Sequence, residues 1–525
     1  MRKMLCKNVP AAAVLLLLAL AACNNPSAVR TGTSLPRSVP EAEGVSSDNI
    51  LAFLEAAQSS RHEFHSFMFL RHGKVIAEGW WEPYKPELRH TLYSTSKSFT
   101  STAAGFAVSE NRLALSDRVV SFFPQDVPDA VSPLLADMTV KDLLMMSAGQ
   151  DPDPTFKVAA NDSNWVRAFL GLPVLHDPGT RFLYNSLATY MVSAIVQKTT
   201  GQKIIDYLTP RLFEPLAIKD MDWEIDPRDI NTGGWGLRLK TEDMAKFGQL
   251  YLQQGKWHGR QLLPAAWIEE ATTFKIDQAP DVAQALKDSS DWMQGYCYQF
   301  WRCRHNAFRA DGAYGQFIIV MPQQDAVIAI TAESPDMQDE LNLVWDYILP
   351  AMQPKKLPEN AAAAANLAQK LSSLALPLPA TAANPPRAAV IGGKTFAFRP
   401  NDRGLQSVSF QFEEGVCQVA LAMEKSDYSL SFGAGTWIFG ETTRLGPNLL
   451  MAARAHYAGL APARIAGCYT WKDDKTLELT LRYIESPHTE TLTCAFEKDK
   501  VLIAGRYSFA PDRELPVLKG EIVDE

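Results

Sequence analysis

The hydrophobic positions of the chain follow helical spacing in some segments and strand-like alternation in others. Two alternating runs, residues 64–71 and 74–81, are joined through His72-Gly73 and predict a β-hairpin. Apolar residues three or four apart, together with cap signals, predict helices around it. Strands that bracket a helical middle predict an α/β domain with an all-α insertion. The further predicted helices are 47–58, 95–110, 140–146, 187–199, 241–254, 264–273 and 337–352, and the late strands are 299–302, 315–321 and 325–331.

The helical spacing fades after an Ala- and Pro-rich segment at residues 354–387. The alanines at 361–365 predict a short helix, and the prolines beyond them predict an extended linker. From residue 388 onward, short β-rich runs alternate with Gly, Asp and Lys turns, which predicts an antiparallel barrel or sandwich. The sequence therefore predicts two folded domains, residues 40–353 and 388–525, joined by this linker.

The first 22 residues have the pattern of a signal peptide. Basic residues precede an apolar run at 11–20, which is too short to span a bilayer comfortably. The following Leu-Ala-Ala-Cys resembles the bacterial lipobox, so Cys23 is predicted to be lipidated, with residues 23–39 as a tether. Asn24 favours the outer membrane by resemblance to known sorting rules, which predicts a lipid-anchored protein of the bacterial cell envelope facing the periplasm. The alternative is an ordinary secretory signal with a chance cysteine.

The net charge argues against one class of partner, and the cysteine spacing argues against a bound metal. The formal charge of -8, from 51 Lys and Arg against 59 Asp and Glu, supplies no overall positive field for phosphate backbones, which argues against nucleic acid. No cysteine pair has zinc-ligand spacing and there is no His-Glu-x-x-His, so neither a metal nor a cofactor is predicted. Pairing among the cysteines of the mature chain beyond the tether stays open. These are Cys297, Cys303, Cys417, Cys468 and Cys494.

Candidate chemistry begins at Ser94 and Lys97, three residues apart at the start of a predicted helix and hence on one face. A serine hydroxyl is a poor nucleophile at neutral pH, and an amine with a lowered pKa can take its proton. The free N–H groups of the helix N-terminus can lower the pKa of a nearby Lys and face a developing oxyanion. Alone, the pair is better explained by an N-cap serine with a solvated lysine one turn later.

A second motif follows about 90 residues later, where a Pro-Gly-Thr-Arg-Phe turn leads into Tyr184-Asn185-Ser186 and a predicted helix. With these motifs in this order, residues 40–352 resemble the serine beta-lactamase and penicillin-recognising superfamily, in its class C, D,D-peptidase and family VIII esterase branch. The nearest likeness is to 6-aminohexanoate-dimer hydrolase-like proteins. The resemblance implies an antiparallel sheet flanked by helices plus an all-α lobe.

The resemblance also implies roles. Ser94 would be the nucleophile and Lys97 would share its proton, while Tyr184 would act as base for acylation and as acid toward the leaving group. A tyrosine with a pKa near 10 needs cationic neighbours to be a base at neutral pH, and Lys97 is the evident one. Ser186 stands where much of the superfamily has Asn, so a side-chain amide for the substrate carbonyl is missing.

A third motif lies in residues 309–320, before a predicted edge strand. Aligning Gly315 with the last glycine of the family's Lys-Thr-Gly places Ala313 at the lysine, and the Gln316 N–H joins the Ser94 N–H as the oxyanion hole. Loss of that lysine removes the charge that binds the carboxylate of penicillins. The cations that could replace it are Arg302, Arg304, His305 and Arg309, and the further candidate pocket residues are Tyr93, Ser186, Trp235, Tyr314 and Gly315.

These residues predict a serine hydrolase that forms an acyl-enzyme on Ser94 and cleaves an ester or amide of a small-molecule or peptide-like substrate, with weak or no beta-lactamase activity. The absence of a Gly-x-Ser-x-Gly elbow disfavours an α/β-hydrolase. The alternative is a catalytically silent sensor or cell-wall binding lipoprotein that kept the fold. Fold analogy by itself does not separate the two.

Overall fold

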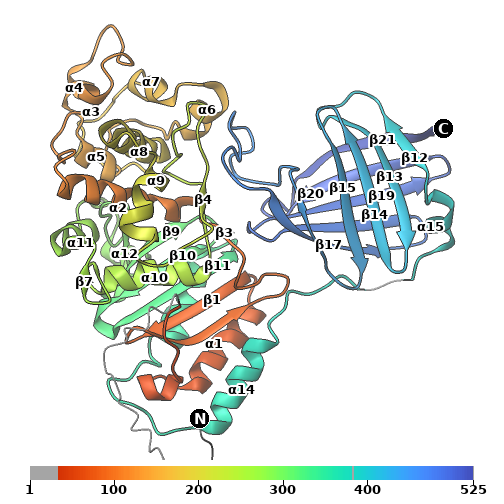
Figure 1. The fold of residues 1–525 in the computed structure, drawn as a ribbon, viewed down its shortest axis with the longest axis horizontal. Coiled ribbons are helices and arrows are strands. Elements are labelled where there is room, and N and C mark those ends of the chain that lie inside the picture. Colours follow the sequence, from red (N-terminus) through yellow and green to blue (C-terminus); the bar gives the residue numbers. More distant parts are fainter. Residues whose placement is uncertain (1–33, 381–382, 524–525) are drawn as a thin grey trace, which may run out of the picture. The chain divides into compact units, whose positions relative to one another are not determined.

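A six-stranded antiparallel sheet forms the base of the first domain in the computed structural model, which describes residues 34–380 and 383–523. The predicted hairpin is confirmed, with His72 and Gly73 both at positive φ (49° and 72°), as a tight turn between twisted strands requires. The strand order is β2-β1-β11-β10-β9-β8 (Figure 1). The strands are β1 (Glu63–Arg71), β2 (Lys74–Trp80), β8 (Trp301–Arg302), β9 (Phe308–Gly312), β10 (Gln316–Met321) and β11 (Ala326–Glu333).

The expected edge strand at 315–321 is wrong in its position. β10 pairs with β11 on one side and β9 on the other, so the edges of the sheet are β2 and β8. The difference arises because Phe308–Gly312, which was not predicted as a strand, forms a strand of its own. Arg309 and Asp311 are two apart in that strand and therefore lie on one face of the sheet.

Helices cover both faces of the sheet, which explains why the central strands are buried nearly throughout. Phe67 and Ile330 pack on one side with α1 (Ser47–Ser59) and α13 (Met337–Leu343). Met68 and Ala329 pack on the opposite side with α2 (Ser96–Ser109). The remaining helices beside the sheet are α10 (Thr241–Leu252), α11 (Ala265–Thr272) and α12 (Gln284–Lys287), and the irregular turns are η1 (Pro40–Glu43), η4 (Arg304–Asn306), η5 (Pro322–Gln324) and η6 (Val344–Ile348).

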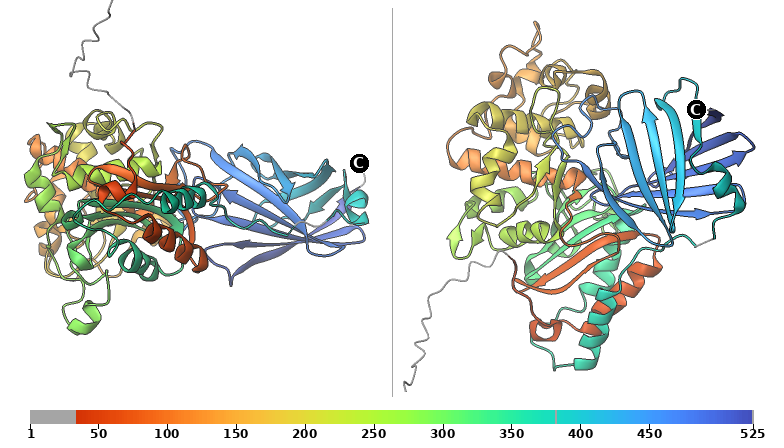
Figure 2. Two further views of the ribbon diagram at one scale, coloured as in Figure 1. Left: turned by 90° about the horizontal axis from the view of Figure 1, so that it is seen from below. Right: turned by 45° about the vertical axis from the view of Figure 1, so that its right-hand side comes forward.

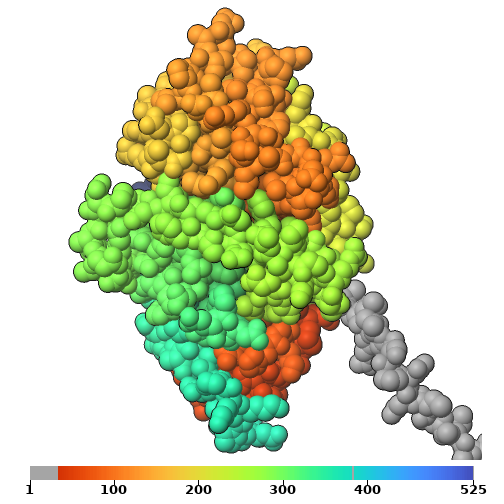
Figure 3. Space-filling model, turned by 90° about the vertical axis from the view of Figure 1, so that its left-hand side faces the viewer, coloured from red at the N-terminus to blue at the C-terminus, as the bar shows by residue number. Residues whose placement is uncertain are grey.

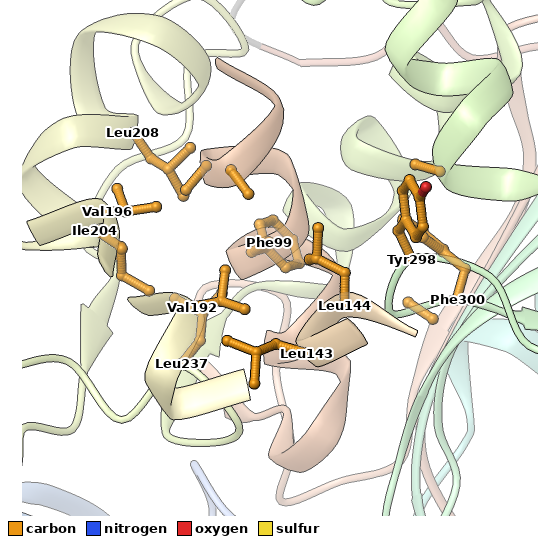
Figure 4. Close-up of a cluster of buried hydrophobic side chains, with 14 of the residues drawn as sticks. Phe99, Leu143, Leu144, Val192, Val196, Ile204, Leu208, Leu237, Tyr298 and Phe300 are labelled. Carbon is orange, nitrogen blue, oxygen red and sulfur yellow. The ribbon is translucent and has the colours of Figure 1, made fainter. Parts of the chain in front are cut away.

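The all-α lobe lies between β2 and β8 in the sequence, as predicted. Its centre is α8 (Ser186–Thr200), whose buried Val192 and Val196 pack near Phe99 of α2 (Figure 4). This packing anchors the two motif-bearing segments to one core. The other elements are η2 (Tyr93–Thr95), α3 (Val119–Phe122), α4 (Pro133–Asp137), α5 (Val140–Leu144), α6 (Thr155–Asn161), α7 (Trp165–Leu170), α9 (Ile204–Leu208), η3 (Thr209–Phe213), β3 (His90–Thr91), β4 (Asp222–Trp223), β5 (Leu237–Leu239), β6 (Lys256–Trp257) and β7 (Arg260–Gln261).

The alanine run in the predicted linker forms α14 (Ala361–Ser372), as expected. The segment is not a free connector, because Leu367, Leu374 and Leu376 are buried in the core of the first domain. The surface of this segment, coloured cyan-green, lies beside that of the red N-terminal helix region in Figure 3. The linker therefore adds a helix to the first domain before the chain leaves it.

The C-terminal domain is a barrel, which resolves the choice between barrel and sandwich. Its strands run in the order β15-β14-β13-β12-β21-β20-β19-β18-β17, and a parallel pairing of β15 with β17 closes this ring of nine, with β16 attached to β17 (Figures 1 and 2). The elements are α15 (Pro386–Ile391), β12 (Thr395–Phe398), β13 (Leu405–Glu413), β14 (Val416–Met423), β15 (Asp427–Ala434), β16 (Ile438–Thr442), β17 (Ala463–Trp471), β18 (Thr476–Tyr483), β19 (Thr489–Glu497), β20 (Lys500–Tyr507) and β21 (Glu514–Val523).

The predicted signal peptide and the lipidation site Cys23 lie outside the described residues and stay predictions. The end of the predicted tether is described and packs on the first domain, where Arg37 forms ion pairs with Glu78 (2.8 Å) and Glu242 (3.0 Å). Within residues 34–380 and 383–523, no helix combines the length and apolar character needed to cross a membrane. The five cysteines left open by the sequence are buried and unbridged.

Candidate active site

Ser94 lies in the 3-10 turn η2, immediately before α2 begins at Ser96. The side chain is half-buried, and the preceding Tyr93 adopts a positive φ of 47°. A bulky residue in this region is strained and persists only where its surroundings hold it. The predicted continuous helix from 95 is therefore preceded by a tight turn that presents the serine. Lys97 follows in the first turn of α2 and is almost completely buried.

The amine of Lys97 lies among three oxygens. Its Nζ donates to Oγ of Ser94 (2.9 Å), Oγ of Ser186 (3.0 Å) and the carbonyl oxygen of Gly234 (2.6 Å). Burial lowers the pKa of Lys97 from 10.5 to about 7, although the charge of Asp153 opposes the shift. Near neutral pH a substantial fraction of this amine is therefore uncharged, with a lone pair that can accept the Ser94 proton.

Tyr184 ends the loop before α8 and contacts the same serine. Its hydroxyl is hydrogen-bonded to Ser94, its ring lies 4.9 Å from the Lys97 Nζ, and it stacks on Trp301 with centroids 5.8 Å apart. Burial raises the pKa of Tyr184 above its ordinary value of 10, and the hydrogen bond from Ser94 only partly offsets this. The phenol thus stays protonated at neutral pH, which suits a proton donor better than the base expected from the resemblance.

The residues after Tyr184 explain how α8 is placed. Asn185 caps the helix by accepting hydrogen bonds from the N–H groups of Leu187 (3.0 Å) and Ala188 (3.1 Å), so its amide is not available to the pocket. Ser186 therefore supplies the hydroxyl that faces Lys97. Gly234 approaches this helix so closely that an added Cβ would lie 2.6 Å from the Ser186 carbonyl oxygen.

The turn between β9 and β10 forms the other side of the site. An added Cβ at Gly312 would overlap the Leu92 carbonyl oxygen, so only glycine lets the turn pack against η2. Ala313 lines the pocket at Ser94. Gln316 does not, because it is fully buried and its side-chain amide donates to the carbonyl oxygens of Ala313 (3.1 Å) and Ala332 (2.6 Å). The pocket lining at the serine thus includes Ala313, whereas the oxyanion role of the Gln316 N–H stays a prediction.

The pocket at Ser94 has a volume of 730 Å³ and mostly aromatic and apolar walls. Trp292, Trp301 and Tyr314 line it together with Met337, and Leu449 comes from the chain that follows β16 in the C-terminal domain. None of these except Tyr314 was predicted from the sequence, because they converge from distant segments. The other candidate, Trp235, is buried core: its indole donates to Glu224 (3.3 Å) and packs on Trp165.

The charged side chains of the pocket lining are two carboxylates, each ion-paired: Asp311 with Arg309 (2.7 Å) and Asp336 with Arg61 (2.7 Å). Within the described part of the chain, its lining holds Asp311 and Asp336 but no Lys, Arg or His. Arg309, one of the expected replacement cations, is fully buried behind the wall, donates to Asp311 (2.7 Å) and packs 4.3 Å from the Trp292 ring. Arg304 is ion-paired with Asp291 (2.9 Å). A replacement for the missing lysine is therefore not found among these residues.

The C-terminal domain also contacts the turn that carries Ser94, and the described residues of both domains belong to one compact unit. The Tyr93 hydroxyl lies 2.5 Å from Nε2 of His488, and Nδ1 of His488 lies 2.7 Å from Glu333. A carboxylate only accepts, so Nδ1 carries a hydrogen toward Glu333, and in the tautomer with its hydrogen on Nδ1 the Nε2 accepts from the Tyr93 hydroxyl. Tyr93 is thus not a pocket wall but a buried link between Ser94 and the barrel.

Comparisons with known proteins agree with this geometry. The family described as Beta-lactamase matches residues 60–353, more than half of the chain. 6-Aminohexanoate-dimer hydrolase of Paenarthrobacter ureafaciens is 26% identical over 295 residues, which cover 52% of this chain and 73% of that protein. Beta-lactamase of Escherichia coli (strain K12) is 24% identical over 157 residues, covering 29% of this chain and 41% of that protein.

A solved structure from Bacillus anthracis, provisionally named a 6-aminohexanoate-dimer hydrolase, shares the fold with a TM-score of 0.53 at 19% identity. The match covers 62% of this chain and 89% of that one. Fold, site and relatives together define a serine hydrolase. The chain belongs to the Beta-lactamase family. The resemblance drawn from the sequence motifs is thereby confirmed.

Proposed function

We propose that the protein forms an acyl-enzyme on Ser94 and cleaves an ester or an amide. The observation that carries this proposal is the buried Lys97 amine, 2.9 Å from the Ser94 oxygen and with a pKa lowered to about 7. An amine in that state can remove the serine proton while Oγ bonds to the substrate carbonyl carbon. A silent sensor would not need this buried amine beside an accessible hydroxyl.

The oxyanion would be held by the backbone N–H groups of Ser94 and Ala313, which we assign in place of Gln316. The tetrahedral intermediate would then collapse, its bond to the leaving oxygen or nitrogen breaking as Tyr184 donates a proton to that atom. Lys97, which carries the serine proton, would return it to Tyr184. Water then attacks the acyl carbonyl, and release of the acid restores Ser94.

The pocket favours substrates whose acyl group is neutral or cationic and partly apolar. Its aromatic walls suit apolar or aryl groups, and the described residues of its lining include no Lys, Arg or His that could bind a substrate carboxylate. This supports weak or no activity on penicillin-like compounds, which carry that charge. Small esters and amides without a carboxylate are the substrates of choice for a first screen.

Labelling with a fluorophosphonate probe tests the proposal. The folded protein should be modified at a single serine, and peptide mapping should place the adduct on Ser94. It should also hydrolyse p-nitrophenyl esters much faster than nitrocefin. A folded protein that reacts with neither activated esters nor the probe would contradict the proposal and favour the sensor alternative.

We further expect His488 to position the nucleophile through Tyr93. His488→Phe and Tyr93→Phe each remove the hydrogen bond while keeping an aromatic ring, and each should lower kcat about fivefold with little change in KM, since a buried hydrogen bond contributes about 1 kcal/mol. The double variant should lose no more than either single one, because both changes break the same bond.

Tyr469→Phe, whose hydroxyl contacts Asn384 elsewhere in the barrel, is the matched control. Additive losses would refute the link.

A further inference from the structure

The C-terminal barrel encloses a second cavity, of 570 Å³, that shares no lining residue with the pocket at Ser94. Its walls come from β13, β14, β15, β18, β19, β20 and β21, strands that lie all around the closed ring. The cavity is therefore inside the barrel. Its volume lies within the range of about 300–1,000 Å³ that small-molecule sites occupy.

The walls of the barrel cavity are apolar along its length. On β14 the lining residues Val419, Leu421 and Met423 alternate with more exposed positions, so every second side chain points inward. Phe410 contributes from β13 and packs edge-to-face with Phe396 and Phe496 of the barrel core. Cys494 is the thiol on the wall, and burial raises its pKa to about 12, so it stays neutral. Such a lining suits a hydrocarbon chain.

One polar group of the cavity lacks a partner. The Nη1 of Arg403, whose side chain is only 20% exposed, is buried without a hydrogen bond. The second arginine of the lining, Arg444, is satisfied by Glu490 (2.8 Å) and the Tyr483 hydroxyl (2.7 Å). A buried guanidinium N–H without an acceptor is costly, and a carboxylate is the acceptor that fits it best.

The charged residues around Arg403 leave one positive charge in the cavity without a negative partner. Glu490 faces both arginines, lying 3.8 Å from Arg403 but bonded to Arg444, so two positive charges share one negative charge. The remaining charged residues of the lining are Asp402, Glu424 and Lys425, which are exposed to solvent. The interior therefore keeps one uncompensated positive charge beside an apolar cavity.

We propose that the barrel binds an aliphatic carboxylate, with its chain along the apolar walls and its carboxylate on Arg403. The ligand class follows from the apolar lining and the unpartnered guanidinium together. This site is separate from the proposed hydrolytic site and does not depend on it. The barrel thereby has a binding function of its own within the same chain.

Fluorescence titration of the full-length protein with 11-(dansylamino)undecanoic acid, followed by displacement with unlabelled dodecanoate, tests the proposal. Saturable binding of the probe and its displacement by dodecanoate are expected, with much weaker displacement by dodecanol or acetate. Absence of saturable binding would overturn the site, and equal displacement by dodecanol would overturn the assignment of the carboxylate to Arg403.

Three variants localise the ligand. Arg403→Gln should weaken dodecanoate binding at least tenfold, whereas Arg506→Gln, on an exposed position of β20 outside the lining, should not change it. Val419→Trp fills the cavity and should remove binding of the probe. Thermal unfolding and ester hydrolysis, expected to stay unchanged in Arg403→Gln, show that the barrel is folded. Unaltered binding in a folded Arg403→Gln variant would contradict the proposal.

Discussion

Ser94→Ala should reduce ester hydrolysis by roughly 10⁴-fold or more and abolish fluorophosphonate labelling, because the variant has no oxygen to form the acyl-enzyme. The substitution removes only a half-buried hydroxyl whose partners are Lys97 and Tyr184, so the fold should persist. Steady-state kcat/KM with p-nitrophenyl butyrate and intact-protein mass after labelling measure the two effects.

Ser101→Ala is the matched control for this loss. Ser101 lies about two turns beyond Ser94 along α2, and its buried hydroxyl has no hydrogen-bond partner, so its removal should leave activity and stability nearly unchanged. Near-native turnover by Ser94→Ala, with Ser101→Ala also active, would place the nucleophile elsewhere and refute the proposed acyl-enzyme.

Lys97→Met should lower kcat by about 10²–10⁴-fold, because it removes the general base while keeping the length of the side chain. In the unchanged protein, kcat/KM should rise with pH through about 7. The lowered pKa leaves Lys97 charged and unable to accept the serine proton below that value, and uncharged above it. In the variant, this limb of the pH profile should be absent.

Lys97→Arg tests whether Lys97 acts as a base or only through its positive charge. Arginine keeps the positive charge but is not deprotonated in proteins, so it should be as inactive as methionine if the amine acts as a base. Values of kcat/KM measured between about pH 5 and 9 for the unchanged protein, Lys97→Met and Lys97→Arg distinguish the two roles of the amine. A variant without Lys97 that keeps the midpoint near 7 would assign that titration to another group.

The fold class and the main catalytic candidates could be predicted from the sequence. Alternation and turn chemistry at His72-Gly73 predicted the hairpin, and the helical spacing of 187–199 and 241–254 predicted α8 and α10 closely. The periodicity of hydrophobic side chains is a local property of the sequence, so it can be recognised without knowing the tertiary contacts. Ser94, Lys97 and Tyr184 were found as a set through the order of their motifs, and the structure brings the three together.

The register of the third motif is not fixed by the local sequence. Shifting the motif by three positions exchanges Ala313 for Gln316, and nothing local distinguishes the two. The structure distinguishes them because Gly312 can pack against the Leu92 carbonyl only without a side chain, which brings Ala313 to the serine and turns Gln316 into the core. The lowered pKa of Lys97 likewise results from burial, which cannot be recognised from a sequence motif.

The sequence by itself thus determined most of the elements, the family resemblance and the candidate pair Ser94 and Lys97. Only the tertiary structure decided which walls the pocket has, that Tyr184 stays protonated, and that the barrel reaches the site. Tyr93 and His488 are 395 residues apart, and their contact depends on how two separately patterned domains pack. The physical reason is that hydrophobic periodicity specifies which face of an element is buried, whereas partners across a core are chosen by shape, charge and desolvation.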